Sequence, residues 1–376
     1  MRDSRDGGRV PRVLLQRLGA VVDADSEDMD AAAATLKRTG ISGVVAFNDD
    51  HLRFTAEIAD RLGLPGYPPE VARTVRNKYL QRRAFQEAGL PQPRFWHLPA
   101  GLTAAELRVI GSTINYPAIV KPTEGAGSRE VIRVDQPGEL ADAYSDSVDQ
   151  LVEEFLAGED AGSTPYSRLV SVDSVVTPAG ISHIVIQGAF PRDDHRATGR
   201  FVPACVSGPE ARLVLEVVSQ AITTLGIRQS MVNTDIMMTD GGPQIIEVNG
   251  RLGGSTPGFL PLVSGLDLRR VALEVALGHP VRFPELAPLQ GVGFSWDLNA
   301  PRNATAVAAV RGTETLAAQP FVHSVRVQVQ PGEALDPQRG TFGVVSILGH
   351  TADHRELLKA GRLIQSAIAI EYKRDA

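Results

Sequence analysis

The chain has 376 residues, of which 43% are hydrophobic, so it is long enough for about two to three domains with buried cores. Its 44 acidic and 38 basic residues give a net charge of −6, which argues against a general nucleic-acid-binding protein, and its single cysteine, Cys205, excludes internal disulfides and cysteine-rich metal sites. No apolar run is long enough to span a bilayer and the charged start is not a secretory signal, so we expect a cytoplasmic protein that acts without a membrane.

The first 75 or so residues alternate short strands and helices, which predicts a small parallel α/β unit. Strands are expected over residues 19–22 and 42–47, and helices over 27–39 and 51–62, the second ending at Gly63. The unit is shortened, because residues 2–11 are polar and contain no clear first strand. A further helix is predicted over residues 74–89, with Gly89 as its end.

The middle of the chain predicts strands around a glycine-containing loop. A capping box from Thr103 to Glu106 opens a short helix. Strands are expected over 116–122, 130–134 and 151–155, and a helix over 138–148. Farther along, the sequence predicts a hairpin over 168–176 and 180–189, a helix over 209–225, a second hairpin, and a helix over 266–277. The last 90 or so residues are rich in short strands, including 322–329 and 343–349, and close with a helix near 353–368.

The second hairpin, over residues 231–239 and 243–249, carries the strongest functional signal. If Asp240-Gly241-Gly242 forms the loop, Thr239 lies opposite Pro243, and counting back places Asp235 opposite Glu247. Because strand side chains alternate, Asn249 shares this face, and Arg251 follows just beyond it. Such hard oxygen donors beside a cation suit Mg²⁺ that bridges phosphate oxygens. The alternative is a solvent-facing hairpin, but Glu247 interrupts an apolar run, where an unpaired charge is costly.

Other candidate features are weak when each is considered alone. The loop with Gly125, Gly127 and Ser128 joins two strands and does not open a helix, so it is not a dinucleotide fingerprint, and the chain has no P-loop. Its backbone could still close over phosphates, although an ordinary hairpin is the commoner alternative. Lys121 in a strand is a phosphate contact or a side chain that reaches solvent, and Lys78 alone is a helix-surface residue.

Taken in chain order, these motifs resemble the ATP-grasp superfamily over roughly residues 40–280. The resemblance rests on the segments RNK with AGLP, PAIVKP, the GAGS loop, VEEFLAG and EVNGR, at residues 76–78, 88–91, 117–122, 125–128, 152–158 and 247–251. Within the superfamily the chain is most similar to carboxylate–amine ligases, which include bacterial L-amino acid ligases and carnosine synthase. The segment RFVPA at 200–204 and the strand-rich last part are similar to the same subgroup.

The resemblance implies a mixed α/β (α+β) ATP-grasp fold in four parts. These are a shortened N-terminal α/β domain at residues 1–92, a small ATP-grasp subdomain at 93–160, a large subdomain with the metal site at 161–280, and a C-terminal β-rich lobe at 281–376.

The resemblance also implies roles for individual residues. Lys78, Lys121 and the loop of Gly125, Gly127 and Ser128 would contact ATP phosphates. Glu153 and the backbone at Glu154, Phe155 and Leu156 would hold adenine. Asp160 would bind the ribose, with Glu159 as the competing choice. Asp235, Glu247 and Asn249 would hold two Mg²⁺ ions, which Mn²⁺ could replace, and Arg251 would stabilise an acyl phosphate or bind the substrate carboxylate, with Gly253 and Gly254 allowing close approach.

We therefore expect an ATP-dependent ligase that joins a small-molecule carboxylate to an amine through an acyl phosphate, on amino-acid-like substrates. A polar rim of His183, His195, Arg196 and Arg200 is a candidate substrate contact, with a solvated loop as its alternative. The alternative functions are an ATP-grasp carboxylase, a nucleotide-pathway ligase or a non-catalytic ATP-binding module. A homodimer is the default expectation for the assembly.

Overall fold

The computed structural model describes residues 2–3, 16–17, 19–24, 28–125, 127–156, 165–191, 196–281, 283, 286–335 and 343–374. The helices are α2 (Met29–Arg38), α3 (Leu52–Leu62), α4 (Pro69–Arg76), α5 (Lys78–Glu87), α6 (Ala104–Gly111), α7 (Leu140–Ala143), α8 (Gly208–Thr224), α9 (Thr256–Ser264), α10 (Leu268–Ala276), α11 (Thr313–Ala317) and α12 (His354–Ala367), with 3₁₀ turns at Asp49–His51 and Pro137–Glu139. None of the helices in these ranges is long and apolar enough to cross a membrane.

Half of the sixteen strands in the described residues form one antiparallel sheet with the order β11-β10-β7-β8-β9-β12-β15-β14. Its strands are β7 (Ser167–Thr177), β8 (Gly180–Ala189), β9 (Gly199–Val202), β10 (Ser230–Thr239), β11 (Gly242–Asn249), β12 (Val292–Asn299), β14 (Val322–Val327) and β15 (Gly343–Thr351). Much of the predicted C-terminal β-rich part therefore continues the sheet that contains the second predicted hairpin. This hairpin, β10 with β11, is called the central hairpin below.

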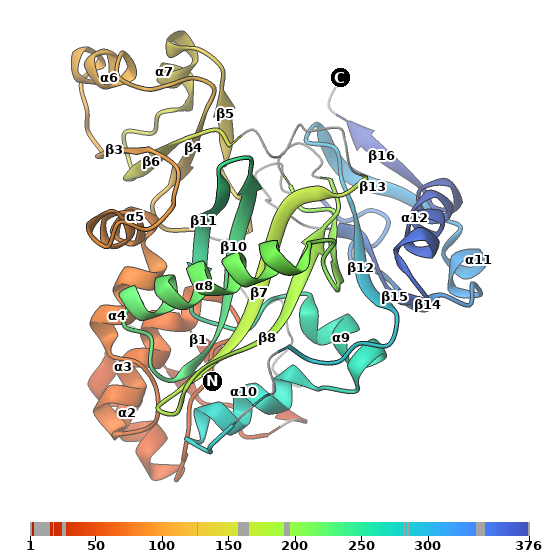
Figure 1. Cartoon of the computed structure of the whole chain (residues 1–376), viewed down its shortest axis with the longest axis horizontal. Coiled ribbons are helices and arrows are strands. Elements are labelled where there is room, and N and C mark those ends of the chain that lie inside the picture. Colours follow the sequence, from red (N-terminus) through yellow and green to blue (C-terminus); the bar gives the residue numbers. More distant parts are fainter. Residues whose placement is uncertain are drawn as a thin grey trace.

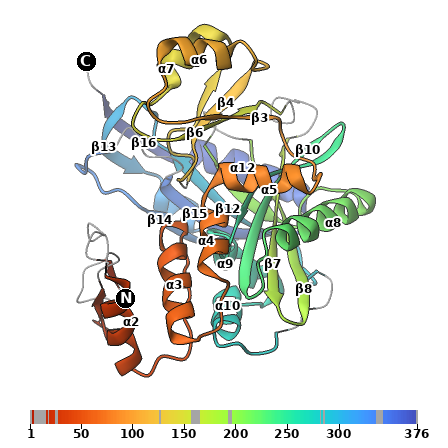
Figure 2. The same cartoon turned by 90° about the vertical axis from the view of Figure 1, so that its left-hand side faces the viewer.

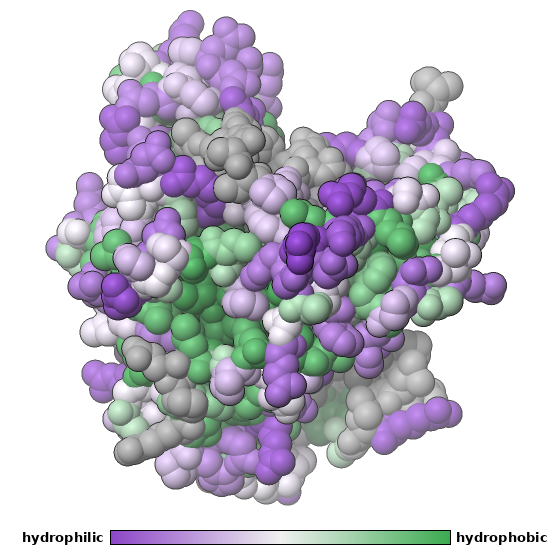
Figure 3. All heavy atoms as spheres, turned by 45° about the vertical axis from the view of Figure 1, so that its right-hand side comes forward, coloured by the Kyte–Doolittle hydropathy of each residue, from purple (hydrophilic) through white to green (hydrophobic). Residues whose placement is uncertain are grey.

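A smaller antiparallel sheet, ordered β3-β6-β4-β5, stands beside this large sheet. Its strands are β3 (Phe95–Leu98), β4 (Ala118–Pro122), β5 (Ile132–Val134) and β6 (Gln150–Glu154). Figures 1 and 2 show it as a projection with α6 and α7 on its outer side, joined to the rest through α5. The top of the molecule in Figure 3, where this projection lies, is mostly hydrophilic. Two short two-stranded ladders complete the fold: β1 (Arg2–Asp3) with β2 (Asp23–Ala24), and β13 (Ala304–Arg311) with β16 (Ala369–Arg374).

The large sheet is covered on both faces. Helix α8 crosses one face (Figure 1) and buries Val214, Val218 and Ile222 against residues of β7, β10 and β11. Helices α9 and α10 pack on the other face through Phe259, Leu260 and other apolar residues. Alternation of side chains along the strands supplies apolar residues to both layers. Polar residues on these strands are therefore enclosed between layers.

Most predicted elements are confirmed, but the N-terminal part differs. Residues 19–22 and 42–47, both predicted as strands, form no strand in the described structure, and Phe47 is half exposed. The helix predicted over 138–148 is reduced to a 3₁₀ turn and α7, and α9, which contains Pro257 and Pro261, was not predicted at all. Prolines argue against a helix, yet the apolar face of α9 is buried.

The single helix predicted over 74–89 is in fact two helices that meet at Asn77. Asn77 has extended backbone angles, and its Oδ1 accepts a hydrogen bond from Leu80 N at 3.0 Å, so it caps α5. The break turns Lys78 into the first residue of α5, and its backbone N donates to Thr123 O at 2.8 Å. The interruption thus docks α5 beside the small sheet.

We predict that Asn77→Ala lowers the free energy of unfolding by about 1 kcal/mol, because the cap of α5 is lost. Asn77→Asp should stay within a few tenths of a kcal/mol of wild type, since it keeps a side-chain acceptor. Urea-induced unfolding of both variants measures the difference. Equal stability of Asn77→Ala and wild type would show that the cap contributes nothing.

Candidate active site

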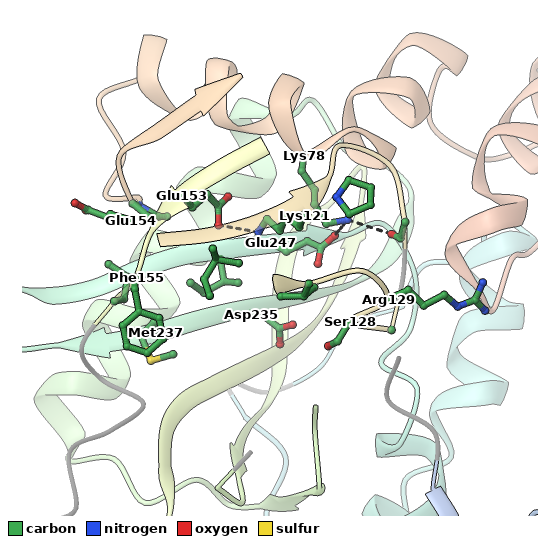
Figure 4. Close-up of a pocket in the computed structure, with 18 residues that line it drawn as sticks. Lys78, Lys121, Ser128, Arg129, Glu153, Glu154, Phe155, Asp235, Met237 and Glu247 are labelled. Atoms are coloured by element: carbon green, nitrogen blue, oxygen red, sulfur yellow. Dashed lines mark hydrogen bonds and ion pairs between the residues drawn. The ribbon is translucent and has the colours of Figure 1, made fainter. Parts of the chain in front are cut away.

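A pocket lies between the small sheet and the central hairpin (Figure 4). One wall comes from β4, β6 and the glycine loop, and the other from β10 and β11. The predicted site residues that line it are Lys78, Lys121, Gly125, Gly127, Ser128, Glu153, Glu154, Phe155, Leu156, Asp235 and Glu247. Segments far apart in the sequence thus meet at one cavity.

The two ends of the pocket differ in character. Phe155 and Met237 lie together at one end in Figure 4, whereas Lys78 and Glu247 lie farther along the pocket, toward Ser128 and Arg129. Ile119 and Ile246 also line the cavity, from opposite walls. The pocket therefore offers an apolar slot at one end and a charged region at the other, which suits a ligand with a flat ring and an anionic tail.

The small-sheet wall contains a buried ion-pair triad. The Glu153 carboxylate accepts from Lys121 Nζ at 2.7 Å and from Arg82 Nε at 2.7 Å. Burial by itself would raise the pKa of Glu153, but the two cations outweigh it and lower the pKa to about 2. Lys121 has the opposite balance: burial lowers the pKa of its ammonium more than Glu153 raises it. Glu153 is therefore held as a carboxylate whose oxygens face cations.

Lys78 connects helix α5 to both the glycine loop and the hairpin. Its Nζ donates to Gly125 O at 3.1 Å and pairs with Glu247 Oε1 at 3.0 Å. Burial raises the pKa of Glu247, but the positive charges of Lys78 and Lys121 lower it by more than burial raises it. The pKa of Glu247 is therefore below its usual range. A carboxylate at this position is thus ready to face a cation.

The hairpin register confirms the pairing of Asp235 with Glu247, although by a different route. The turn is one residue tighter than expected, because Thr239 pairs with Gly242 and not with Pro243. A β-bulge then inserts Ile246 between the partners of Ile236 and Asp235, which restores the expected pairing. The two carboxylates therefore lie directly opposite each other on adjacent strands.

This pair of carboxylates fits a hard divalent cation. Asp235 accepts a hydrogen bond from Ser171 and pairs with Arg200 at 3.3 Å. Glu247 pairs with Lys78. Both carboxylates therefore already face a positive charge. Asn249 lies two residues after Glu247 and is mostly buried. Within the described ranges no group of three or more His, Cys, Asp or Glu side chains is placed to hold a metal ion. Asn249 is not among the residues that line the pocket, and the two carboxylates of Asp235 and Glu247 supply oxygen donors of the kind that Mg²⁺ prefers.

Arg251 lies outside the pocket lining and is held by the N-terminal part. Its Nη2 and Nε donate to Asp49 Oδ2 at 2.5 and 3.1 Å. Burial lowers the pKa of the guanidinium, but Asp49, Glu247 and Asp235 raise it overall, so Arg251 is a fixed cation near both hairpin carboxylates. Asp49 was not among the predicted site residues, and nothing local in the sequence distinguishes it.

The glycines after Arg251 have a structural explanation at one position. Gly253 N donates to Asp173 Oδ1 at 3.1 Å, and a Cβ on Gly253 would lie 2.7 Å from that oxygen. Asp173 is fully buried, which raises its pKa, and it also accepts from Asn233 at 3.0 Å and Gln187 at 2.7 Å. A Cβ on Gly254 would meet no atom within 4 Å. The close approach at Gly253 is therefore to Asp173.

The predicted substrate rim does not assemble at this pocket. His183 exchanges hydrogen bonds with Ser174 at 2.9 Å and with Ser219 of α8 at 2.8 Å, so it lies beneath α8. Arg196 donates to Ala300 O at 2.7 Å and is buried. Of the three rim residues that the structure describes, Arg200 reaches the site, through Asp235. The predicted residues Glu159, Asp160 and His195 lie outside the described residues.

Some residues in or beside the pocket were not predicted, and the sequence contains a signal for two of them. Ile119 and Met237 lie two residues from Lys121 and Asp235 along their strands, so each shares a face with a predicted residue. Ile246 lines the pocket because of the bulge, and Arg82 reaches Glu153 from α5. The first pair follows from alternation, whereas the other two required the tertiary structure.

Comparisons with known proteins agree with this geometry. Residues 75–255 match the family model of the ATP-grasp domain. An uncharacterised protein from Sinorhizobium fredii is 28% identical over 83% of the chain and 65% of its own length, and alanine–anticapsin ligase from Bacillus subtilis is 23% identical over 67% and 57%. The chain thus spans only about three fifths of the length of these relatives. The solved L-amino acid ligase from Bacillus licheniformis matches with a TM-score of 0.77 at 22% identity, over 93% of this chain and 86% of that one. The ATP-grasp fold expected from the resemblance is confirmed.

The lowered pKa of Glu153 predicts a pH-dependent contribution to stability. Because its folded pKa, about 2, lies below the ordinary value of 4.5 for a glutamate, this contribution is present above about pH 4.5 and is lost as the pH falls toward 2. Glu153→Gln should therefore be more destabilising at pH 7 than at pH 3. Urea-induced unfolding of both proteins at the two pH values checks this. An equal difference at both values would contradict the ion-pair assignment.

Proposed function

Because residues 75–255 match the family model of the ATP-grasp domain, we propose that this chain is an ATP-dependent ligase that joins a carboxylate to an amine. The observation that carries the proposal is the Asp235–Glu247 pair at the charged end of a pocket whose other end is apolar. A nucleoside triphosphate has the matching distribution, with an aromatic base at one end and phosphates at the other. The curated relative that acts on alanine supports amino-acid-like substrates.

In this proposal the base occupies the apolar slot between Ile119 and Met237, next to the chain at Glu154–Leu156. Backbone groups at the end of β6 would meet the edge of the base. The phosphates would lie toward Lys78 and Lys121, beneath the loop of Gly127 and Ser128. Lysine ammonium groups and loop N–H groups are the usual partners of phosphate oxygens.

Asp235, Glu247 and Asn249 would hold up to two Mg²⁺ ions, which offset the negative charge of the phosphates when bound. Lys78 pairs with Glu247 at 3.0 Å in the structure without a ligand. When ATP and Mg²⁺ bind, the Lys78 ammonium would leave Glu247 and contact phosphate oxygens. Arg200 stands in the same relation to Asp235. The two internal ion pairs would thus be replaced by contacts with the phosphates and the metal ions.

The chemistry proceeds in two steps. A carboxylate oxygen of the first substrate attacks the γ-phosphorus of ATP, and ADP leaves, which gives an acyl phosphate. The amine of the second substrate then attacks the acyl carbon and inorganic phosphate leaves, which gives the amide. Arg251, fixed by Asp49 near both hairpin carboxylates, would stabilise charge on the acyl phosphate. The glycine loop would exclude water, which would otherwise hydrolyse the intermediate.

Phosphate release from ATP and Mg²⁺, with single amino acids and then pairs of them, tests the proposal directly. A ligase should release phosphate only with a carboxylate donor and faster with an amine partner. Bicarbonate-dependent release would indicate a carboxylase instead. Tight ATP binding without turnover for any pair would favour a non-catalytic ATP-binding module.

We predict that Glu247→Gln lowers the rate of ADP formation by at least about 100-fold, because a metal-binding carboxylate is lost at the phosphate end. Glu87→Gln is a suitable control, since Glu87 is an exposed acid of α5 that pairs with the exposed Arg83. Initial rates with a saturating substrate pair measure the effect. A normal rate in Glu247→Gln would remove Glu247 from the metal site.

A separate prediction concerns the transfer of a carboxylate oxygen atom in the acyl-phosphate step. A carboxylate donor labelled with ¹⁸O should transfer one ¹⁸O atom to the phosphate that is released, because that oxygen attacks the γ-phosphorus. Mass spectrometry of the phosphate detects the label. Unlabelled phosphate alongside amide formation would exclude an acyl phosphate while leaving the ligase activity in place.

A further inference from the structure

Strand β11 is an edge strand, and helix α5 supplies the hydrogen bonds that a further strand would otherwise provide. It is the first strand in the order of the large sheet, with only β10 as its neighbour. Gln81 Nε2 donates to Val248 O at 2.9 Å, and Val248 N donates to Gln81 Oε1 at 3.0 Å. Arg82 Nη2 donates to Ile246 O at 2.6 Å. Glu247 therefore lies between two residues whose backbones α5 holds in place.

The same guanidinium also reaches the opposite wall of the pocket. Arg82 Nε donates to Glu153 Oε1 at 2.7 Å, while the other oxygen of Glu153 accepts from Lys121 at 2.7 Å. The Arg82 side chain is only 1% exposed and does not line the pocket. One rigid planar group thus joins the wall that carries Lys121 and Glu153 to the bulge that precedes Glu247.

We propose that Arg82 is a positioning residue that couples the two walls, so that nucleotide binding at the small sheet is linked to metal binding at Glu247. The inference rests on the proposed function. A guanidinium suits this role because its adjacent donors have a fixed geometry and its charge is permanent. A lysine side chain is shorter and ends in a single nitrogen, so it would hold only one of the two acceptors, Glu153 Oε1 or Ile246 O. Coupling of this kind is a free energy shared between two ligands, so each strengthens the binding of the other.

The test measures ADP affinity by titration calorimetry, with and without Mg²⁺, in the full chain. In wild type, Mg²⁺ should strengthen ADP binding. Arg82→Lys should keep the metal-free ADP affinity within about threefold but lose about tenfold of the Mg²⁺ enhancement, the loss expected for one charged hydrogen bond. Arg83→Met is the matched control, because Arg83 is the next residue on α5, is 55% exposed and pairs with the exposed Glu87.

A merely structural role would lower the melting temperature without changing the enhancement, so full enhancement in Arg82→Lys overturns the proposal. An equal loss in Arg83→Met overturns it too. If Arg82→Lys does not fold, Glu153→Gln breaks the other end of the link and should lose at least about fivefold of the enhancement. Absence of ADP binding in wild type would defeat the proposed function itself, whereas ADP binding with unchanged enhancement in both variants defeats only the coupling.

Discussion

The site depends on one constraint: charged groups taken out of water must meet opposite charges. A buried carboxylate or ammonium without a partner costs far more than a protein of this size can tolerate. Here the partners come from different elements, since Glu153 of β6 meets Lys121 of β4 and Arg82 of α5. Satisfying these charges therefore requires the small sheet, α5 and the hairpin to come together, and the pocket is the space that remains between them.

The arrangement also explains why the pocket is charged before any ligand binds. Lys78 with Glu247 and Arg200 with Asp235 are pairs in which each partner can exchange the other for a ligand group of the same charge. Phosphate oxygens can replace the carboxylate, and a divalent cation can replace the ammonium or guanidinium. The internal pairs thus stabilise the site without a ligand and hold its side chains near the positions that the proposed ligand contacts require.

The sequence predicted what alternation and capping determine, and failed where tertiary contacts decide. The capping box at Thr103 and the pairing of Asp235 with Glu247 follow from local rules, although a tighter turn and the bulge at Ile246 cancelled to give the expected pairing. The break at Asn77 and the reach of Arg82 depend on docking of α5 against β11. No local pattern shows that an arginine on a helix crowded with arginines is the buried one.

In the N-terminal part, a wrong element prediction does not affect how the candidate site residue Arg251 is held. Residues 42–47 form no strand, yet they deliver Asn48, whose side chain accepts from His51 N at 3.1 Å and opens the turn that carries Asp49. Asp49 then fixes Arg251, while Tyr67 OH donates to Gly250 O at 3.2 Å. Together with the bond from Gly253 to Asp173, these contacts hold the Arg251 loop from two sides. The guanidinium is therefore positioned by capping and ion pairing, for which a regular strand before Asp49 is not needed.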